Sequence, residues 1–363
     1  MPNPIAQIQK NLQNSPRAAA LVADPVSRRY LTGFDSSDGL VFIAPGAALF
    51  LTDSRYIEAA RESVTACLVE ELTDASKQLR ALCARHRVQR LFVETRRTTL
   101  AQAEQYRRWL PGVWIERGSR LDQRLRALRM HKGEAEVSSI QAAQAIAERA
   151  LQEILPLLRP GVSEREIALE LDYAMLRGGG EAVSFETIVV SGENGSKPHG
   201  VPGSRKLQSG DLVTLDFGAV VGGYHSDMTR TVAVGAVEGE QRQIYDIVLQ
   251  AQLAALAALG PGVPCRDVDA AARDIIKAAG CGEHFRHGTG HGVGLEIHEA
   301  PTLSSKSKDI LAPGMVVTVE PGIYLPGGRA ERIRCGVRIE DMALITEDGY
   351  ENLTNMDKKL LVL

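Results

Sequence analysis

The sequence predicts an α+β protein of two domains, in which a small α/β domain precedes a larger domain made of two similar halves. Three observations support this prediction. The 363 residues are more than one hydrophobic core usually fills. Residues 20–126 alternate short apolar runs with helical segments, and the rest of the chain repeats one pattern of helix, turn, helix and strands. We place the boundary near residues 128–132, so the expected domains are residues 1–130 and 131–363.

The first domain has the elements of a small sheet flanked by helices. Apolar runs predict strands at residues 40–44, 48–52 and 90–94, and residues 55–63 are expected to form a helix. No group of residues with the spacing of a catalytic or metal site occurs in this part of the sequence. We therefore expect the function to reside in the second domain.

The second domain begins with a long amphipathic helix and contains an internal repeat. From Glu134 onward, apolar residues recur at steps of three and four along one face, namely Val137, Ile140, Ala147, Leu151, Ile154 and Leu158. The segment that starts at Pro160 recurs at Pro261, and residues 210–216 match residues 314–320 position by position. Two such halves would form antiparallel sheet covered by helices about a pseudo-twofold axis.

The repeat places acidic residues at equivalent points in strands. Asp216 and Asp227 lie in two strand-like runs, and a turn centred on residues 221–222 would put them directly opposite each other. Like charges in that position destabilise an antiparallel pair by roughly 0.2–1 kcal/mol, and a bound cation would remove the repulsion. The second half carries Glu320 and Glu340 in corresponding strands. A single strand acid is usually solvent-exposed, but four at repeat-equivalent positions indicate a shared site.

Histidines lie close to these acids in the repeat. Residues 285–298 are rich in glycine, which lets the backbone approach a site closely, and they contain His287, His291 and His298. His199 occupies the similar place in the first half. A lone histidine is more often a satisfied polar residue than a ligand, and the glycine context makes His291 the strongest imidazole candidate.

This combination of side chains favours a pair of divalent metal ions. The candidate ligands are Asp216, Asp227, His291, Glu320 and Glu340. Oxygen ligands with one imidazole favour Mn²⁺, Co²⁺, Fe²⁺ or Zn²⁺, and four carboxylates balance the charge of two such ions. Two ions about 3.5–4 Å apart activate water and polarise a carbonyl, which makes hydrolysis the expected reaction. Calcium is the alternative, but EF-hand spacing is absent from the sequence and a histidine ligand is foreign to it.

Composition excludes several other classes of function. The formal net charge of −3 lacks the basic excess that nucleic-acid binding needs. The start of the chain lacks the pattern of a signal peptide, and the longest apolar stretch is too short to cross a bilayer, so we expect a cytoplasmic protein with no membrane partner. The five cysteines are widely spaced and odd in number, which predicts reduced thiols. Neither a nucleophile elbow nor a Walker lysine is present in the sequence.

The motifs of the second domain resemble those of the pita-bread metallopeptidases, and among these most closely Xaa-Pro dipeptidases (prolidases) and aminopeptidases P. The segments that carry the resemblance are residues 214–218, 226–231, 288–299, 318–324 and 336–341. Residues 29–39 and 51–56 resemble the creatinase-type N-terminal domain of the same family. The resemblance thus covers nearly the whole chain. It implies a pita-bread fold for the second domain, a creatinase-like first domain and a homodimer.

The resemblance also implies a role for each site residue. Asp216 would bind one ion, His291 with Glu320 would bind the other, and Asp227 with Glu340 would bind both; manganese is the expected metal. Glu320 would also be the general base. His199 and His298 match two histidines that contact the substrate without binding metal, and His287 and Arg338 match substrate-pocket positions. Phe185 either stacks on the proline ring or is structural. Strand alternation independently places Arg338 on the face of Glu340, and Thr229 on the face of Asp227.

The expected activity is hydrolysis of the bond between an N-terminal residue and proline. The substrates would be Xaa-Pro dipeptides or longer peptides that begin with Xaa-Pro. We favour the dipeptidase because the linker 327–335, longer and more basic than the family pattern, supplies Arg329, Arg332 and Arg334, which could bind a free carboxylate. An ordinary solvated loop remains the alternative for these arginines. The rival functions are a metal-free creatinase-like amidinohydrolase and a non-catalytic binding module.

Overall fold

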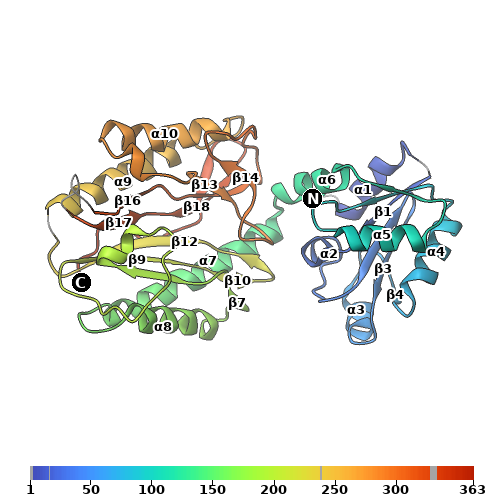
Figure 1. The fold of residues 1–363 in the computed structure, drawn as a ribbon, viewed down its shortest axis with the longest axis horizontal. Helices are drawn as coiled ribbons and strands as arrows, with labels where there is room; N and C mark the ends of the chain where they lie inside the picture. Colours follow the sequence, from blue (N-terminus) through green and yellow to red (C-terminus); the bar gives the residue numbers. More distant parts are fainter. Residues whose placement is uncertain (1–2, 16, 238, 328–332) are drawn as a thin grey trace. The chain divides into compact units, whose positions relative to one another are not determined.

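The chain divides into two compact units, Met1–Arg129 and Met130–Leu363. This computed structural model describes residues 3–15, 17–237, 239–327 and 333–363. Figure 1 labels helices and strands of both units. Within the described residues, none of the helices is both long and apolar enough to cross a membrane. All five cysteines are free thiols.

The first unit is a six-stranded mixed sheet with helices on both faces, in the strand order β4-β3-β2-β1-β5-β6. Its strands are β1 (Ala18–Val22), β2 (Leu40–Ala44), β3 (Ala47–Thr52), β4 (Leu68–Glu71), β5 (Arg90–Val93) and β6 (Trp114–Glu116). Its helices are α1 (Pro4–Leu12), α2 (Pro25–Thr32), α3 (Ile57–Ser63), α4 (Ala75–Arg85), α5 (Leu100–Trp109) and α6 (Arg120–Met130). One apolar core lies under α1, α2 and α6, and another lies under α4 and α5. The α/β class predicted for this part is confirmed.

The second unit consists of two halves that repeat the same order of elements. The first half has α7 (Glu134–Ile154), α8 (Glu164–Arg177), β7 (Ala182–Val183), β8 (Ile188–Ser191), β9 (Asp211–Phe217), β10 (Ala219–Val221), β11 (Tyr224–His225) and β12 (Met228–Val234). The second half has α9 (Gly239–Ala257), α10 (Cys265–Ala278), β13 (Gly290–Gly292), β14 (Glu299–Leu303), β15 (Val316–Val319), β16 (Gly322–Leu325), β17 (Cys335–Arg338), β18 (Asp341–Ile345) and β19 (Tyr350–Asn352). The predicted duplication and the helix that begins at Glu134 are confirmed.

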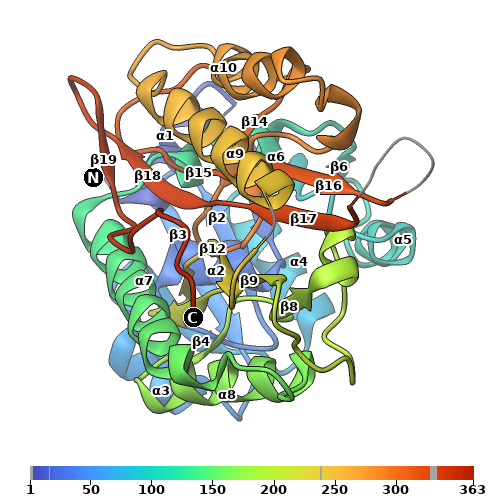
Figure 2. The ribbon, with the colours of Figure 1, turned by 90° about the vertical axis from the view of Figure 1, so that its left-hand side faces the viewer.

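The helices of this unit cover the outer sides of the strands. Figures 1 and 2 show α7 and α8 on one side of the unit and α9 and α10 on the other, with the strands between them. Each helix pair buries its own apolar core against the strands of its half. The strand ladders of the unit are antiparallel, as predicted. Strands β9 and β12 meet β17 at the centre, where Thr231 Oγ1 donates to the carbonyl of Arg338 over 3.0 Å.

The first half contains a hairpin whose register differs from the prediction. The turn lies at Gly222 and Gly223, with φ of 59° and 78°, and the ladder pairs Asp216 with Thr229. The prediction that Asp216 faces Asp227 directly is therefore wrong by two residues. A two-residue hairpin turn of this kind needs positive φ at both central positions, which two glycines adopt easily and a β-branched valine at position 221 does not. Because the shift is two residues, every side chain keeps its predicted face.

Candidate active site

The acids and histidine singled out in the sequence come from both halves and meet between them. Asp216 lies in β9, and Asp227 lies immediately before β12. His291 lies in β13, Glu320 directly follows β15, and Glu340 lies between β17 and β18. Asp216 and His291 lie within strands and the other three lie directly beside a strand end, so the antiparallel ladders hold the backbone at or next to each residue.

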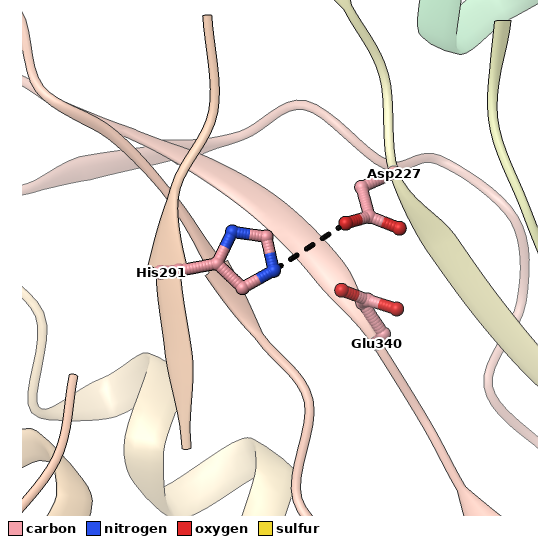
Figure 3. Close-up of side chains that lie close together, drawn as sticks. All are labelled: Asp227, His291 and Glu340. Carbon is pink, nitrogen blue, oxygen red and sulfur yellow. Dashed lines mark ion pairs between the residues drawn. The ribbon is translucent and has the colours of Figure 1, made fainter. Parts of the chain in front are cut away.

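Three of these residues form a group with the geometry of a metal site. Ligand atoms of Asp227, His291 and Glu340 all lie within 4.8 Å of one another, and Figure 3 shows the three side chains converging. His291 Nε2 is 3.6 Å from Asp227 Oδ2 and 3.3 Å from Glu320 Oε1. Asp216 joins the group through Arg338, whose Nη2 forms an ion pair with Asp216 Oδ2. All five candidate ligands therefore line one cavity, and three of them form the group with metal-site geometry.

Burial and mutual repulsion disfavour the ionised form of the acids in this site. Burial, followed by the charges of Glu340 and Asp216, raises the pKa of Asp227 well above its usual range. Burial also raises the pKa of Glu340 strongly, and it raises that of Glu320 to about 8 although Arg338 opposes the shift. The same burial lowers the pKa of His291 to about 4, so its imidazole is neutral at pH 7 and can act as a metal ligand.

Two carboxylate oxygens in the site are buried without a partner. Asp216 Oδ1 and Glu340 Oε1 accept no hydrogen bond from any described residue. Glu340 Oε2, in contrast, accepts a 2.6 Å hydrogen bond from Thr229 Oγ1. Buried polar atoms are normally paired, so two unpaired carboxylate oxygens among neighbouring acids fit residues that bind cations. The donor set is four carboxylates and one neutral imidazole, which suits Mn²⁺, Co²⁺, Fe²⁺ or Zn²⁺.

Arg338 is the buried cation beside these acids, 4% exposed. It donates to Asp216, to Thr229 Oγ1 over 3.1 Å and to Tyr324 Oη over 2.9 Å. Burial by itself would lower the pKa of Arg338, but Tyr324 and the surrounding acids outweigh it and raise the pKa further. Arg338 therefore remains protonated and balances part of the negative charge.

The remaining predicted residues surround the same cavity of about 1070 Å³. The ring of His298 lies 4.4 Å from that of His291, centroid to centroid. His287 Nε2 is 2.9 Å from Tyr324 Oη, and burial lowers the pKa of His287 to about 4. His199 and Phe185 line the cavity wall. The candidate ligands, the candidate histidines, Phe185 and Arg338 thus all line one cavity.

Both units of the chain match known protein families. Residues 138–347 match the model described as metallopeptidase family M24, and residues 4–131 match the creatinase/prolidase N-terminal domain. The chain belongs to metallopeptidase family M24. The family resemblance seen in the sequence is thereby confirmed, and so are the fold and the peptidase class that it implied.

Relatives in the M24 family match this chain over most of its length. An uncharacterized peptidase, YqhT of Bacillus subtilis, is 40% identical over 344 residues, covering 94% of this chain and 95% of its own. The Xaa-Pro dipeptidase of Pyrococcus furiosus is 42% identical over 247 residues, 68% of this chain and 69% of the relative. The solved Xaa-Pro dipeptidase of Bacillus anthracis is 37% identical, with a TM-score of 0.93 and 99% of each chain covered. The X-Pro aminopeptidase of Thermotoga maritima is 33% identical, with a TM-score of 0.89 over 98% of this chain and 100% of that one.

Several residues of this M24 chain, not predicted from the sequence, form hydrogen bonds to the site residues or to the segment that carries them. Tyr324 Oη accepts a hydrogen bond from Arg338 and lies 2.9 Å from His287 Nε2. In the sequence this residue is marked only as a tyrosine in the apolar strand run Gly322–Leu325. On α10, Asp269 is 1% exposed and accepts from the backbone and hydroxyl of Thr289. Arg273, bonded to Asp269, donates to the carbonyl oxygens of Phe285 and His287 over 2.9 and 2.8 Å. These contacts fix the glycine-rich segment that carries His287 and His291, but helical spacing alone did not reveal them.

Proposed function

We propose that this chain is a two-metal exopeptidase that hydrolyses the bond between an N-terminal residue and proline, with Xaa-Pro dipeptides as its preferred substrates. The observation that carries the proposal is the group of Asp227, Glu340 and the neutral His291, with Asp216 and Glu320 lining the same cavity and two carboxylate oxygens left unpaired among the described residues. The name of the Pyrococcus furiosus relative, Xaa-Pro dipeptidase, supports the substrate class.

The five ligand candidates would hold two divalent ions, with Mn²⁺ preferred. Asp216 would bind one ion, His291 and Glu320 the other, and Asp227 and Glu340 would serve both. When bound, the ions would lower the pKa of the attacking water and polarise the scissile carbonyl. They would also neutralise the carboxylates whose pKa values burial raises.

The protein's own residues would orient the substrate and move the proton. Glu320 would accept a proton from the attacking water and deliver it to the proline nitrogen as the peptide bond breaks. His199 and His298 would donate hydrogen bonds to the carbonyl oxygen as it gains negative charge. Phe185 would pack against the proline ring, and His287 with Arg338 would shape the pocket around it.

Two observations bear on the length of the substrate. Arg334, for which the sequence left open carboxylate binding or an ordinary solvated loop, pairs with Glu193 over 3.2 Å, while Arg329 and Arg332 lie outside the described residues. The cavity of about 1070 Å³ is close to the upper end of the roughly 300–1,000 Å³ typical of small-molecule sites, which leaves room for either a dipeptide or a longer peptide. These observations keep an Xaa-Pro aminopeptidase acting on longer peptides as the second candidate, which the name of the Thermotoga maritima structure also suggests.

Direct cleavage assays decide between these functions. Protein loaded with Mn²⁺ should cleave Ala-Pro, should leave Ala-Ala intact, and should lose activity on chelation. Faster cleavage of Ala-Pro-Ala than of Ala-Pro would establish the aminopeptidase. Activity that survives complete metal removal would support an amidinohydrolase-like mechanism, and metal binding without any peptide cleavage would support a binding module.

A further inference from the structure

His199 sits on a loop, and its own side chain does not fix its position. The residue is exposed and lines the cavity, and its ring makes no hydrogen bond with any residue in the described part of the chain. The loop starts at Ser191, the last residue of β8, and passes through a 3₁₀ helix (Gly192–Ser196) before it reaches His199. The position of the imidazole therefore depends on where the backbone of this loop is held.

One buried carboxylate holds the loop on both sides of His199. Glu164, the first residue of α8, is 0% exposed. Before His199, its Oε1 accepts from Ser191 N over 2.8 Å and from Ser191 Oγ over 2.7 Å, and both of its oxygens lie 3.2 Å from Asn194 Nδ2. After His199, its Oε2 accepts from Gly203 N over 3.2 Å. Hydrogen bonds to a buried charged acceptor are stronger than neutral ones, so this single side chain ties the two ends of the loop together.

The middle of the loop is fixed from the opposite side by the second half. The carbonyl of Pro198 accepts from Arg338 Nη1 over 3.4 Å. Gly195 packs so closely on the backbone of Gly336 in β17 that an added Cβ would lie 3.1 Å from its nitrogen. The segment that carries His199 thus lies between α8, which holds it through Glu164, and β17, which belongs to the site.

We propose that Glu164 is a positioning residue for hydrolysis and acts through His199, an inference that rests on the proposed function. Glu164 does not line the cavity and has no contact with the ligand group. In Glu164→Gln, an NH₂ donor replaces one acceptor oxygen and faces the existing donors, so one end of the loop loses its anchor. A displacement of about 1 Å in a reacting group can reduce the rate by on the order of 100-fold.

A double-mutant cycle tests this proposal on the Mn²⁺-loaded enzyme with Ala-Pro and Ala-Pro-Ala. We expect Glu164→Gln to lower kcat by roughly tenfold to 100-fold, with unchanged metal content and little change in KM. In the His199→Ala background the same substitution should change kcat less than about twofold, because a group that acts through His199 has nothing left to position. The matched control is Glu166→Gln, two residues along α8, whose carboxylate accepts hydrogen bonds from Ser163 N and Oγ at the exposed helix start. It should leave kcat unchanged.

Additive effects of Glu164→Gln and His199→Ala would overturn the proposal, as would a loss of metal in Glu164→Gln equal to its loss of activity. If Glu164→Gln does not fold, Asn194→Ala removes one contact of the same carboxylate without leaving a buried amide among donors, and the same cycle applies to it. Failure of the proposed function gives a different result, since the wild-type protein would then cleave neither peptide.

Discussion

At the scale of single residues, the carboxyl group of Asp227 is central to both metal binding and stability. It is 4% exposed, and burial, followed by the charges of three neighbouring acids, raises its pKa. We predict that Asp227→Asn lowers metal affinity by roughly 100-fold or more, because even residues that only contact ligands contribute about 10–100-fold. Activity should fall with the metal content. In the metal-free protein at pH 8 the same change should raise the melting temperature, because it removes an acid whose raised folded-state pKa destabilises the fold as pH rises.

Metal analysis after dialysis and thermal unfolding measure the two effects separately. A variant with full metal content and full activity would show that Asp227 is not a ligand. A fall in the melting temperature of the metal-free variant at pH 8 would show that its carboxylate is stabilised in the empty site.

His199→Ala should affect the reaction without affecting the metal. The residue lies on the cavity wall and outside the group of ligand atoms. Removing one donor to a developing oxyanion typically lowers kcat by roughly 10²–10³-fold. Steady-state kinetics combined with metal analysis test this prediction. Loss of one metal equivalent in the variant would mean that His199 is a ligand.

The four acids could be nominated from the sequence because the duplication places them at equivalent positions in the two halves. Strand alternation placed Arg338 and Thr229 toward the acids, and the structure has both there, joined by a hydrogen bond of 3.1 Å. The link from Arg338 to Tyr324 and His287 was not predictable in the same way. It depends on how β16 pairs with β17 and on where the 285–289 segment is held by α10, which are long-range contacts without a local signal.

At the scale of secondary-structure elements, the first hairpin shows that one aspect of strand pairing is easier to predict from the sequence than another. Alternation assigned each side chain to the correct face, but the register depended on which two residues formed the turn. Position 221 is β-branched and prefers negative φ, so the turn moved to Gly222 and Gly223. Asp216 consequently pairs with Thr229, the residue that holds Glu340.

Strand β13 needs a glycine beside its histidine. A Cβ on Gly290 would lie 1.9 Å from the carbonyl oxygen of Thr318, so any side chain there would push β13 away from β15. We predict that Gly290→Ala costs about 1–3 kcal/mol of stability and weakens metal binding by displacing His291. Gly282→Ala, whose Cβ would meet Lys277 at an ordinary 3.5 Å, is the control. Calorimetric titration with Mn²⁺ and thermal unfolding test both variants, and equal behaviour of the two would contradict the prediction.

At the scale of the whole molecule, the site links stability to pH and metal. Burial gives Glu320 a folded-state pKa of about 8 against an ordinary value of 4.5, and it raises those of Asp227 and Glu340 in the same direction. An acid with a raised folded-state pKa stabilises the fold fully below its unfolded-state pKa, and this contribution is lost as pH rises through the folded value. We therefore predict that metal-free protein loses stability between about pH 4.5 and pH 8.

Bound metal should reverse this trend, since an ion that binds only the folded state at 100 times its Kd adds about 2.7 kcal/mol. For a unit of this size, that corresponds to a rise in melting temperature of roughly 5–10 °C. The rise should be large at pH 8 and small at pH 5, where protons compete for the ligands. Scanning calorimetry with and without Mn²⁺ at both pH values provides the test. Equal rises at the two pH values would show that the acids do not share one site.

Because the two halves belong to one chain, the site does not have to be symmetric. Asp216 and Asp227 come from the first half, and His291, Glu320 and Glu340 come from the second. Two separate identical chains would have to present the same residues twice and would assemble only above some threshold of protein concentration. A covalent connection removes that threshold by keeping both halves at a high effective concentration. It also lets corresponding positions diverge, so that β13 carries His291 among the acids while β8, which pairs with β9 as β13 pairs with β15, carries no histidine.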